Sequence, residues 1–229
     1  MSTSLIDLLS PKGGANEPGR FFGVVIGIVT NNQDSGGMAR VKVKFPWLSD
    51  DNESTWARIA VPMAGNGRGT YFLPEVEDEV LVAFEHGDVR FPYVVGALWN
   101  GKDAPPTTNS DGKNNIRVIH SRSGHLIRLD DTQDAEKVEV ISKSGALVRL
   151  DDTSGSEKVE VIDKTGNNKM TIQSSDNSMD LECAGKMTLH ASMGIEITSD
   201  ADITIQAQTT MDIESTAPMT IKGAMVSIN

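Results

Sequence analysis

The sequence is poor in several residue types, and each shortage excludes a class of structure or function. Its 229 residues contain one cysteine, Cys183, so no disulfide can form within the chain. A net charge of -11 and few aromatic residues (six Phe, three Trp, two Tyr) argue against binding to nucleic acid, and the charge also argues against an anionic membrane. No run of 18 apolar residues and no N-terminal signal pattern is present, so we expect the chain to be made and folded in a cytosol.

Residues suited to catalysis or metal binding are also sparse. Four histidines, His86, His120, His125 and His190, lack the spacing with carboxylates or cysteine that metal sites show. His120 and His125 are five apart and would lie on opposite faces of a regular strand. His190 follows the apolar Leu189 and should point outward, which argues against an axial metal. We expect no cofactor, no metal and no catalytic residue.

Two further patterns resemble functional motifs but favour structural interpretations. The carboxylate pairs Asp130/Asp131 and Asp151/Asp152 recur at the same place in two tandem repeats, which is typical of turn capping rather than of catalysis or calcium binding. The glycine-rich run at residues 65–69 lacks the following helix that a phosphate loop needs, so we interpret it as a barrel loop.

What the sequence does contain is a repeat of eight residues, which runs from Met179 to the C-terminus. Each octad opens with an apolar-x-apolar pair, as in MDLECAGK, IEITSDAD and MTIKGAMV. Because side chains alternate along a strand, both apolar side chains of a pair face one side. A monomeric meander would also give one apolar face, but no Asn-Gly or Asp-Gly turn occurs after Met179.

Octad length predicts the number of chains. A closed β-helix needs roughly 20 or more residues per turn, so eight residues supply one wall, and three chains would close a turn of about 24 residues. We therefore predict a homotrimer with an apolar axis. The predicted trimer core consists of Met170, Ile172, Met179, Leu181, Met187, Leu189, Ile195, Ile197, Ile203, Ile205, Met211, Ile213, Met219 and Ile221.

A longer repeat precedes the octads. Residues 121–141 and 142–162 are identical at 15 of 21 positions, and each unit predicts two strands joined by a polar turn. A truncated third copy follows and grades into the octads. We interpret residues 116–229 as one tapering β-helix needle, with the 21-residue repeats at 121–162 and the octads at 170–229.

The first part of the chain has a different pattern. Residues 1–20 contain SLIDLL and a Gly/Pro-rich stretch, which we interpret as a linker or docking segment. Five short alternating strands are predicted over residues 21–100, and a five-stranded barrel of the OB type fits their number and length. Residues 101–115 form a second linker, and the predicted fold class is all-β.

These motifs together resemble the central spike of contractile injection machines, which include contractile phage tail baseplates, phage-tail-like particles and the VgrG protein of type VI secretion systems. ARVKVKFPW (39–47), WARIAVPMAG (56–65), the segment 69–88 and FPYVVGALWNGKDAPP (91–106) look like the OB fold of that family. SRSGHLIRLDDT (121–132) looks like the start of its β-helix. The family often has Gly where this chain has Glu77, and we expect a local loop difference there.

The resemblance implies a mechanical function. The chain would be a structural, membrane-piercing spike and not an enzyme, found in the baseplate of a virion or injection particle. The resemblance implies a baseplate hub protein bound at the OB end, with Phe21 or SLIDLL as contacts. It also implies a PAAR-type tip protein at the C-terminal end, on Ser227, Ile228 and Asn229. VgrG has a hub domain before the barrel, and some phage spikes have a lysozyme domain after it; this sequence contains neither.

Two alternatives belong to other functional classes. A carbohydrate-degrading or glycan-binding trimeric tail protein would need a carboxylate cluster in a groove, and turnover of polysaccharide would reveal it. An OB barrel that binds oligonucleotides would show a salt-dependent interaction with single-stranded DNA. The charge and the few aromatic residues argue against the second alternative.

Overall fold

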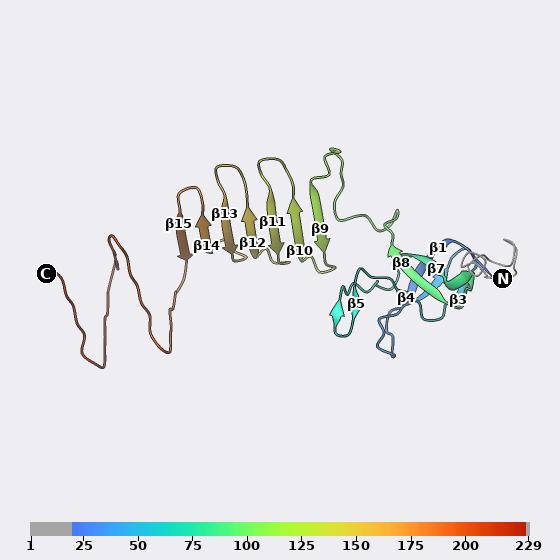
Figure 1. The fold of residues 1–229 in the computed structure, drawn as a ribbon, viewed down its shortest axis with the longest axis horizontal. Helices are drawn as coiled ribbons and strands as arrows, with labels where there is room; N and C mark the ends of the chain where they lie inside the picture. The colour runs from blue at the N-terminus through green and yellow to red at the C-terminus, as the bar shows by residue number, and fades with distance from the viewer. Residues whose placement is uncertain (1–19, 228–229) are drawn as a thin grey trace, which may run out of the picture.

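The structure is a computed structural model that describes residues 20–227, with side chains omitted for residues 49–52. It is all-β apart from one short 3-10 helix, η1 (Glu85–Gly87), within these residues. Two sheets follow one another along the chain, and an extended segment follows the second (Figure 1). The segment SLIDLL and the predicted tip contacts Ile228 and Asn229 lie outside the described residues.

The first sheet is OB-like and has six strands in the order β3-β2-β1-β7-β8-β4. These are β1 (Val24–Asn31), β2 (Lys42–Phe45), β3 (Ser49–Glu53), β4 (Arg58–Ile59), β7 (Glu79–Phe84) and β8 (Pro92–Ala97). All neighbours are antiparallel except β4 and β8, which are parallel. The count exceeds the five strands expected from sequence because residues 49–53 pair with β2.

A bridge between Val41 and Ala57 curls this sheet toward closure. The Ala57 N–H donates to the Val41 carbonyl at 2.7 Å, and the Val41 N–H donates to the Ala57 carbonyl at 3.1 Å. Val41 directly precedes β2, and Ala57 directly precedes β4, which is the last strand in the order of the sheet. The bridge therefore connects two distant parts of the sheet. The enclosed core is Val29, Val41, Val43, Phe45, Ala57, Val80, Val82, Phe84 and Val94.

The glycine-rich run at residues 65–69 is a tight hairpin beside the first sheet, in agreement with the interpretation as a barrel loop. It joins β5 (Ala64–Gly65) to β6 (Arg68–Gly69) through Asn66 and Gly67. Gly69 has φ +146°, and a Cβ there would lie 2.4 Å from the Met63 carbonyl oxygen. Only glycine fits this position.

The second sheet is an antiparallel meander of seven strands in sequence order. These are β9 (Ile116–His120), β10 (Leu126–Asp130), β11 (Lys137–Ile141), β12 (Leu147–Asp151), β13 (Lys158–Ile162), β14 (Asn168–Gln173) and β15 (Ser178–Cys183). Each 21-residue repeat supplies one turn and two strands, as its sequence predicted. The last strand, β15, contains the first octad pair, Met179 and Leu181, so the meander includes one octad.

Residues 184–227 have no assigned strand, yet they keep the octad period. The backbone bends at 184–185, 192–193, 200–201, 208–209, 216–217 and 224, which are eight residues apart. Between the bends the chain is extended and changes direction repeatedly (Figure 1). Nothing within the described residues is a helix long and apolar enough to cross a membrane.

Candidate assembly surface

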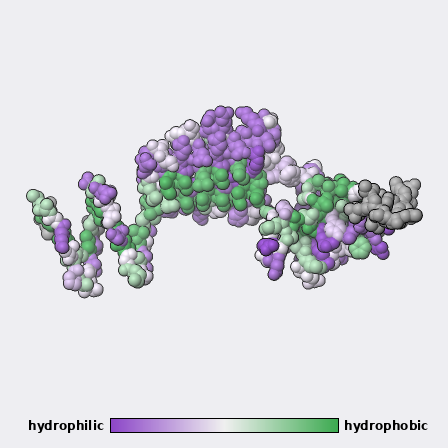
Figure 2. Space-filling view, in the orientation of Figure 1, coloured by the Kyte–Doolittle hydropathy of each residue, from purple (hydrophilic) through white to green (hydrophobic). Residues whose placement is uncertain are grey.

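One face of the second sheet is apolar except at β9, where Arg117 stands opposite Leu129. Side chains alternate between faces, and the strand register places the apolar ones opposite one another, as in Ile127↔Val140 and Val161↔Met170. We call this the apolar face; it comprises Ile119, Ile127, Leu129, Val138, Val140, Val148, Leu150, Val159, Val161, Met170, Ile172, Met179 and Leu181. Figure 2 shows it as a hydrophobic band along the sheet.

The octad pairs after residue 184 continue this pattern without any cover. Their apolar side chains are between 45% (Met187) and 71% (Ile205) exposed in the single chain. Of the predicted trimer core, Met170, Ile172, Met179 and Leu181 lie on the apolar face, and the others lie in the bent extended segment. Whether they meet on an axis stays a prediction.

The area of uncovered apolar surface is large for one small chain. Seven strands about 4.8 Å apart, carrying two columns of side chains, present about 450 Å². The octads after β15 present a similar area, so one chain exposes about 900 Å² in total. We call the apolar face and the octad pairs together the apolar strip. Single monomers rarely expose more than about 300–600 Å² in one patch, and a standard interface buries about 800 Å² per partner. The strip is large enough for a stable interface.

The opposite face of the sheet carries two columns of alternating charges, beside an apolar column of Leu126, Ile141, Leu147 and Ile162. Arg128, Glu139, Arg149 and Glu160 stand opposite one another on β10 to β13 and form one ladder. Arg149 donates from Nε to Glu139 at 2.8 Å and from an η nitrogen to Glu160 at 3.1 Å. Burial disfavours the charged guanidinium, but these two carboxylates raise the pKa of Arg149 overall. A second column alternates Asp130, Lys137, Asp151 and Lys158.

The first carboxylate of each repeated pair, Asp130 or Asp151, caps a turn, as the sequence indicated, whereas Asp131 pairs with Arg117. The backbone N–H and hydroxyl of Thr132 both donate to Asp130, at 3.0 and 2.6 Å. The Thr132 hydroxyl is the main cause that lowers the pKa of Asp130. Burial raises the pKa of Asp151, but hydrogen bonds from Thr153 outweigh it and leave the pKa below its usual value. These groups are occupied by local hydrogen bonds.

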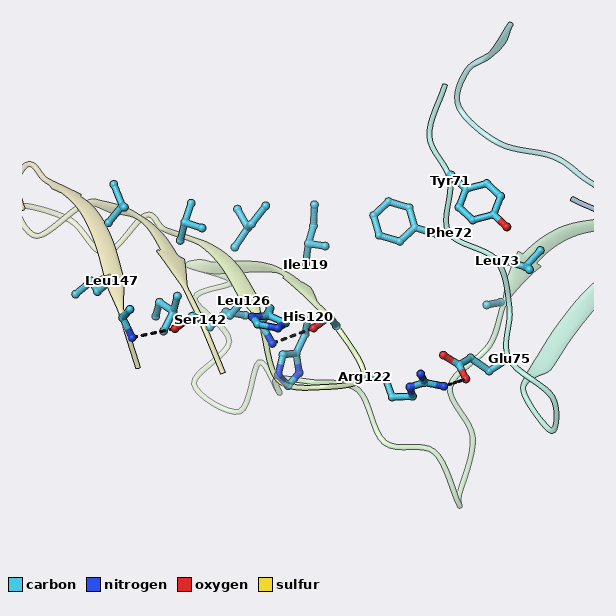
Figure 3. Close-up of a pocket in the computed structure, with 18 of the residues that line it drawn as sticks. Tyr71, Phe72, Leu73, Glu75, Ile119, His120, Arg122, Leu126, Ser142 and Leu147 are labelled. Atoms are coloured by element: carbon cyan, nitrogen blue, oxygen red, sulfur yellow. Dashed lines mark hydrogen bonds and ion pairs between the residues drawn. The ribbon is translucent and has the colours of Figure 1, made fainter. Parts of the chain in front are cut away.

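His120 and His125 do not share one strand, because β9 ends at His120 and a turn separates it from β10. Both line one hollow at the β9 end of the second sheet, next to the OB sheet, rather than opposite faces of a strand (Figure 3). We call this end the collar end. His125 accepts a hydrogen bond at Nδ1 from the Lys143 N–H at 3.2 Å. Among residues 20–227 no group of three His, Cys, Asp or Glu side chains is arranged to hold a metal ion.

An aromatic cluster lies at the other end of the first sheet. Phe21 stacks on Trp47 with ring centroids 5.5 Å apart, and Phe45 and Phe84 continue the cluster into the core. Trp47 remains half exposed. Phe91, which follows η1 in the sequence, is also half exposed. Phe21, a predicted hub contact, thus lies where the described chain begins.

The first sheet corresponds to a known domain. Residues 25–99 match the model of the Type VI secretion system/phage-baseplate injector OB domain. The Type VI secretion system spike protein VgrG3 of Vibrio cholerae serotype O1 is 36% identical over 78 residues, which are 32% of this chain and 8% of that protein. Over this domain the chain is similar to VgrG.

Other VgrG relatives match over a similar or slightly longer range. The Type VI secretion system spike protein VgrG1a of Pseudomonas aeruginosa is 29% identical over 112 residues, or 44% of this chain and 17% of that protein. The actin cross-linking toxin VgrG1 of Vibrio cholerae is 36% identical over 78 residues, or 32% of this chain and 7% of that protein. The match thus spans less than a fifth of each VgrG relative.

Two features of this chain were missed in the sequence. The Arg and Glu residues of the ladder recur in LIRLD, LVRLD and KVEVI. These repeated positions can be recognised as a ladder only once the strand register is known. Tyr71 and Phe72, both exposed, lie at the collar end of the apolar face. No periodic pattern marked these two, because they lie in a loop.

Proposed function

We propose that this chain is the structural, membrane-piercing central spike of a contractile injection machine. The observation that carries the proposal is the pairing of an injector OB domain with a long apolar strip that one chain leaves uncovered. In such a machine a contracting sheath drives the spike against a target envelope. The part must resist compression, and a sheet without free edges around a dry core meets that demand.

The assembly proposed is a homotrimer. Bends every eight residues divide the C-terminal segment into short extended walls, and three walls would close one layer of a prism. Seven layers about 4.8 Å apart give a needle of about 35 Å for the octads. The apolar strips of three copies would then cover one another, and residues 116–229 would form the needle.

Further partners follow from the two ends. A baseplate hub would bind the OB end, where Phe21, Trp47 and Phe91 are partly exposed. A PAAR-type tip protein would bind the C-terminal end, on Ser227, Ile228 and Asn229. The proposed domain limits are residues 20, 100 and 115. The spike would assemble in the cytoplasm and be located in the baseplate of a virion or injection particle.

The solution mass tests this function first. Light scattering on the purified chain should give a stable species of about 75 kDa, three times the 24.6 kDa chain. A monomer at micromolar concentration would contradict the spike. Mixing the trimer with candidate tip proteins tests the C-terminal partner, and turnover in a cell-wall turbidity assay would contradict a purely structural role.

A further inference from the structure

A hollow lies between the OB domain and the second sheet, at the collar end of the apolar face. One wall is the loop that carries Tyr71, Phe72 and Leu73, and the floor includes Ile119 and Ile127 (Figure 3). Tyr71 is 72% exposed and Phe72 is 65% exposed, while Ile119 is half exposed. Two large aromatic side chains therefore stand beside an apolar surface with nothing between them.

Geometry places Phe72 on the side of the sheet that the apolar face occupies. In Figure 3, Ile119 rises from β9 toward the level of Phe72, whereas Leu126 and His120 point the other way. An ion pair between Arg122 and Glu75 joins the turn after β9 to the same loop. The loop is thus held at the end of the apolar face rather than over the charged ladder.

The polar groups around the hollow argue against a small soluble ligand. Arg122 and Glu75 are paired with each other, and His125 is bonded to the backbone of Lys143. A ligand pocket usually directs a few polar groups at its ligand to fix orientation. His120 also lines the hollow, but most of the lining is Phe72, Tyr71 and the aliphatic floor.

A second copy of this chain is the occupant that the surface fits. Part of the lining of the hollow, Ile119, Ile127 and Val140, is the first part of the apolar strip, so whatever covers the strip also enters the hollow. We propose that Tyr71 and Phe72 pack against Ile119 of the partner subunit and close the needle core at its collar end. This proposal rests on the trimer proposed above, and it assigns an interface role to two residues outside the repeats.

A photo-crosslinker at position 72 tests the contact directly. Phe72 is replaced by p-benzoylphenylalanine in the full chain, and irradiation should give covalent dimers and trimers whose crosslinked peptides map to residues 116–130. The matched control carries the same group at Asp180, which lies on the charged face of β15. It should give no crosslink between chains.

Mass measured on the same samples separates the two proposals. A 75 kDa species with no crosslink between chains from position 72 would overturn the collar contact and leave the trimer intact. A monomer would overturn both proposals. A trimer with crosslinks from 72 to residues 116–130 supports both.

A second measurement needs no unnatural residue. Phe72→Ser should leave the mass trimeric but speed hydrogen exchange at the β9 amides about tenfold, because truncating a buried interface aromatic commonly costs at least that factor in stability. Phe72→Leu, which keeps an apolar side chain, should restore most of the protection. Unchanged exchange in the trimeric Phe72→Ser variant would overturn the contact.

Discussion

The two sheets of this chain treat apolar side chains in opposite ways. All the buried apolar side chains among residues 20–227 lie at or before Val94, inside the OB sheet. The second sheet buries only Glu139, Asp151 and Glu160 and leaves its apolar face open. Burial of apolar surface is the main favourable term in folding. The first sheet gains this term within one chain, whereas the second sheet does not.

This difference indicates where each region obtains its stability. The OB sheet encloses its own core and needs no other copy to cover it. The proposed needle region would gain most from further copies, because its apolar side chains are still exposed to water in one chain. Within one chain, the side chains of this region are stabilised mainly by the ion pairs of the charged ladder. Substitutions in the two regions should therefore differ in whether their effects depend on protein concentration.

The largest effect is expected for Ile205→Asp in the octads. In the proposed trimer three carboxylates would meet on the axis without counter-charges, at a cost of several kcal/mol each. Light scattering should show loss of the 75 kDa species. Thr204→Asp is the matched control, because position 204 faces the other side of the same extended segment. Normal assembly of Ile205→Asp would show that the octad phase is wrong.

A smaller effect is expected for the ladder residue Arg149. Arg149→Leu removes hydrogen bonds to Glu139 and Glu160 and should cost about 2–3 kcal/mol, because it leaves buried carboxylates short of a partner. Arg128 and Lys158 still pair with them and limit the loss. Denaturant unfolding measures the change.

The control for Arg149→Leu is Lys169→Met. Lys169 pairs with Glu182 at 3.0 Å in the same sheet, but that pair is more exposed. Its loss should cost less than about 1 kcal/mol. Equal costs for the two variants would show that burial of the ladder has no energetic consequence.

Much of this architecture could be predicted from sequence, because the signals were periodic. Alternation in LIRLD and KVEVI predicted strand pairs, and the octad period of the sequence reappears in the structure as bends every eight residues. Periodicity favoured a β-helix from residue 116, and it did not predict that residues 116–183 pair as a meander within one chain. Met179 and Leu181 carry the octad motif, yet they pair with Ile172 and Met170 in β14 and β15. An apolar-x-apolar pair fits both arrangements equally well.

Features that depend on contacts between distant segments were beyond the sequence. Strand β3 pairs with β2 without any alternating apolar pattern, so the sixth strand of the OB sheet was missed. Phe72 and Ile119 line one hollow although they are 47 positions apart, and the loop that carries Phe72 has no repeat. His120 and His125 line one hollow only because a turn separates them. In each case tertiary structure, not local periodicity, brings the residues together.

In the OB sheet, Val82→Ala should cost about 2 kcal/mol. Val82 is fully buried, and removing two methyl groups loses transfer free energy and leaves a small cavity. Unlike the octad substitution, its effect should be the same at low and high protein concentration. Val95→Ala, at an exposed position of β8, should cost less than about 0.5 kcal/mol. Concentration dependence in Val82→Ala would contradict the separation between the two regions.

The smallest effect is expected at Glu77, where the resemblance had indicated glycine. Glu77 has φ +78°, in the left-handed region, and its N–H donates to the Val29 carbonyl at 2.8 Å. A non-glycine residue there costs about 1–2 kcal/mol, of which the greater freedom of glycine in the unfolded chain offsets part.

Glu77→Gly should therefore stabilise the OB sheet by about 0.5–1 kcal/mol, measured as a higher denaturant midpoint. Glu77→Ala removes the carboxylate but keeps the Cβ, so it should give no such gain. If alanine stabilised as much as glycine, the charge of Glu77 and not its backbone conformation would be the source. Because the strain lies within one chain, the gain should be independent of trimer assembly, which separates this local effect from those in the needle.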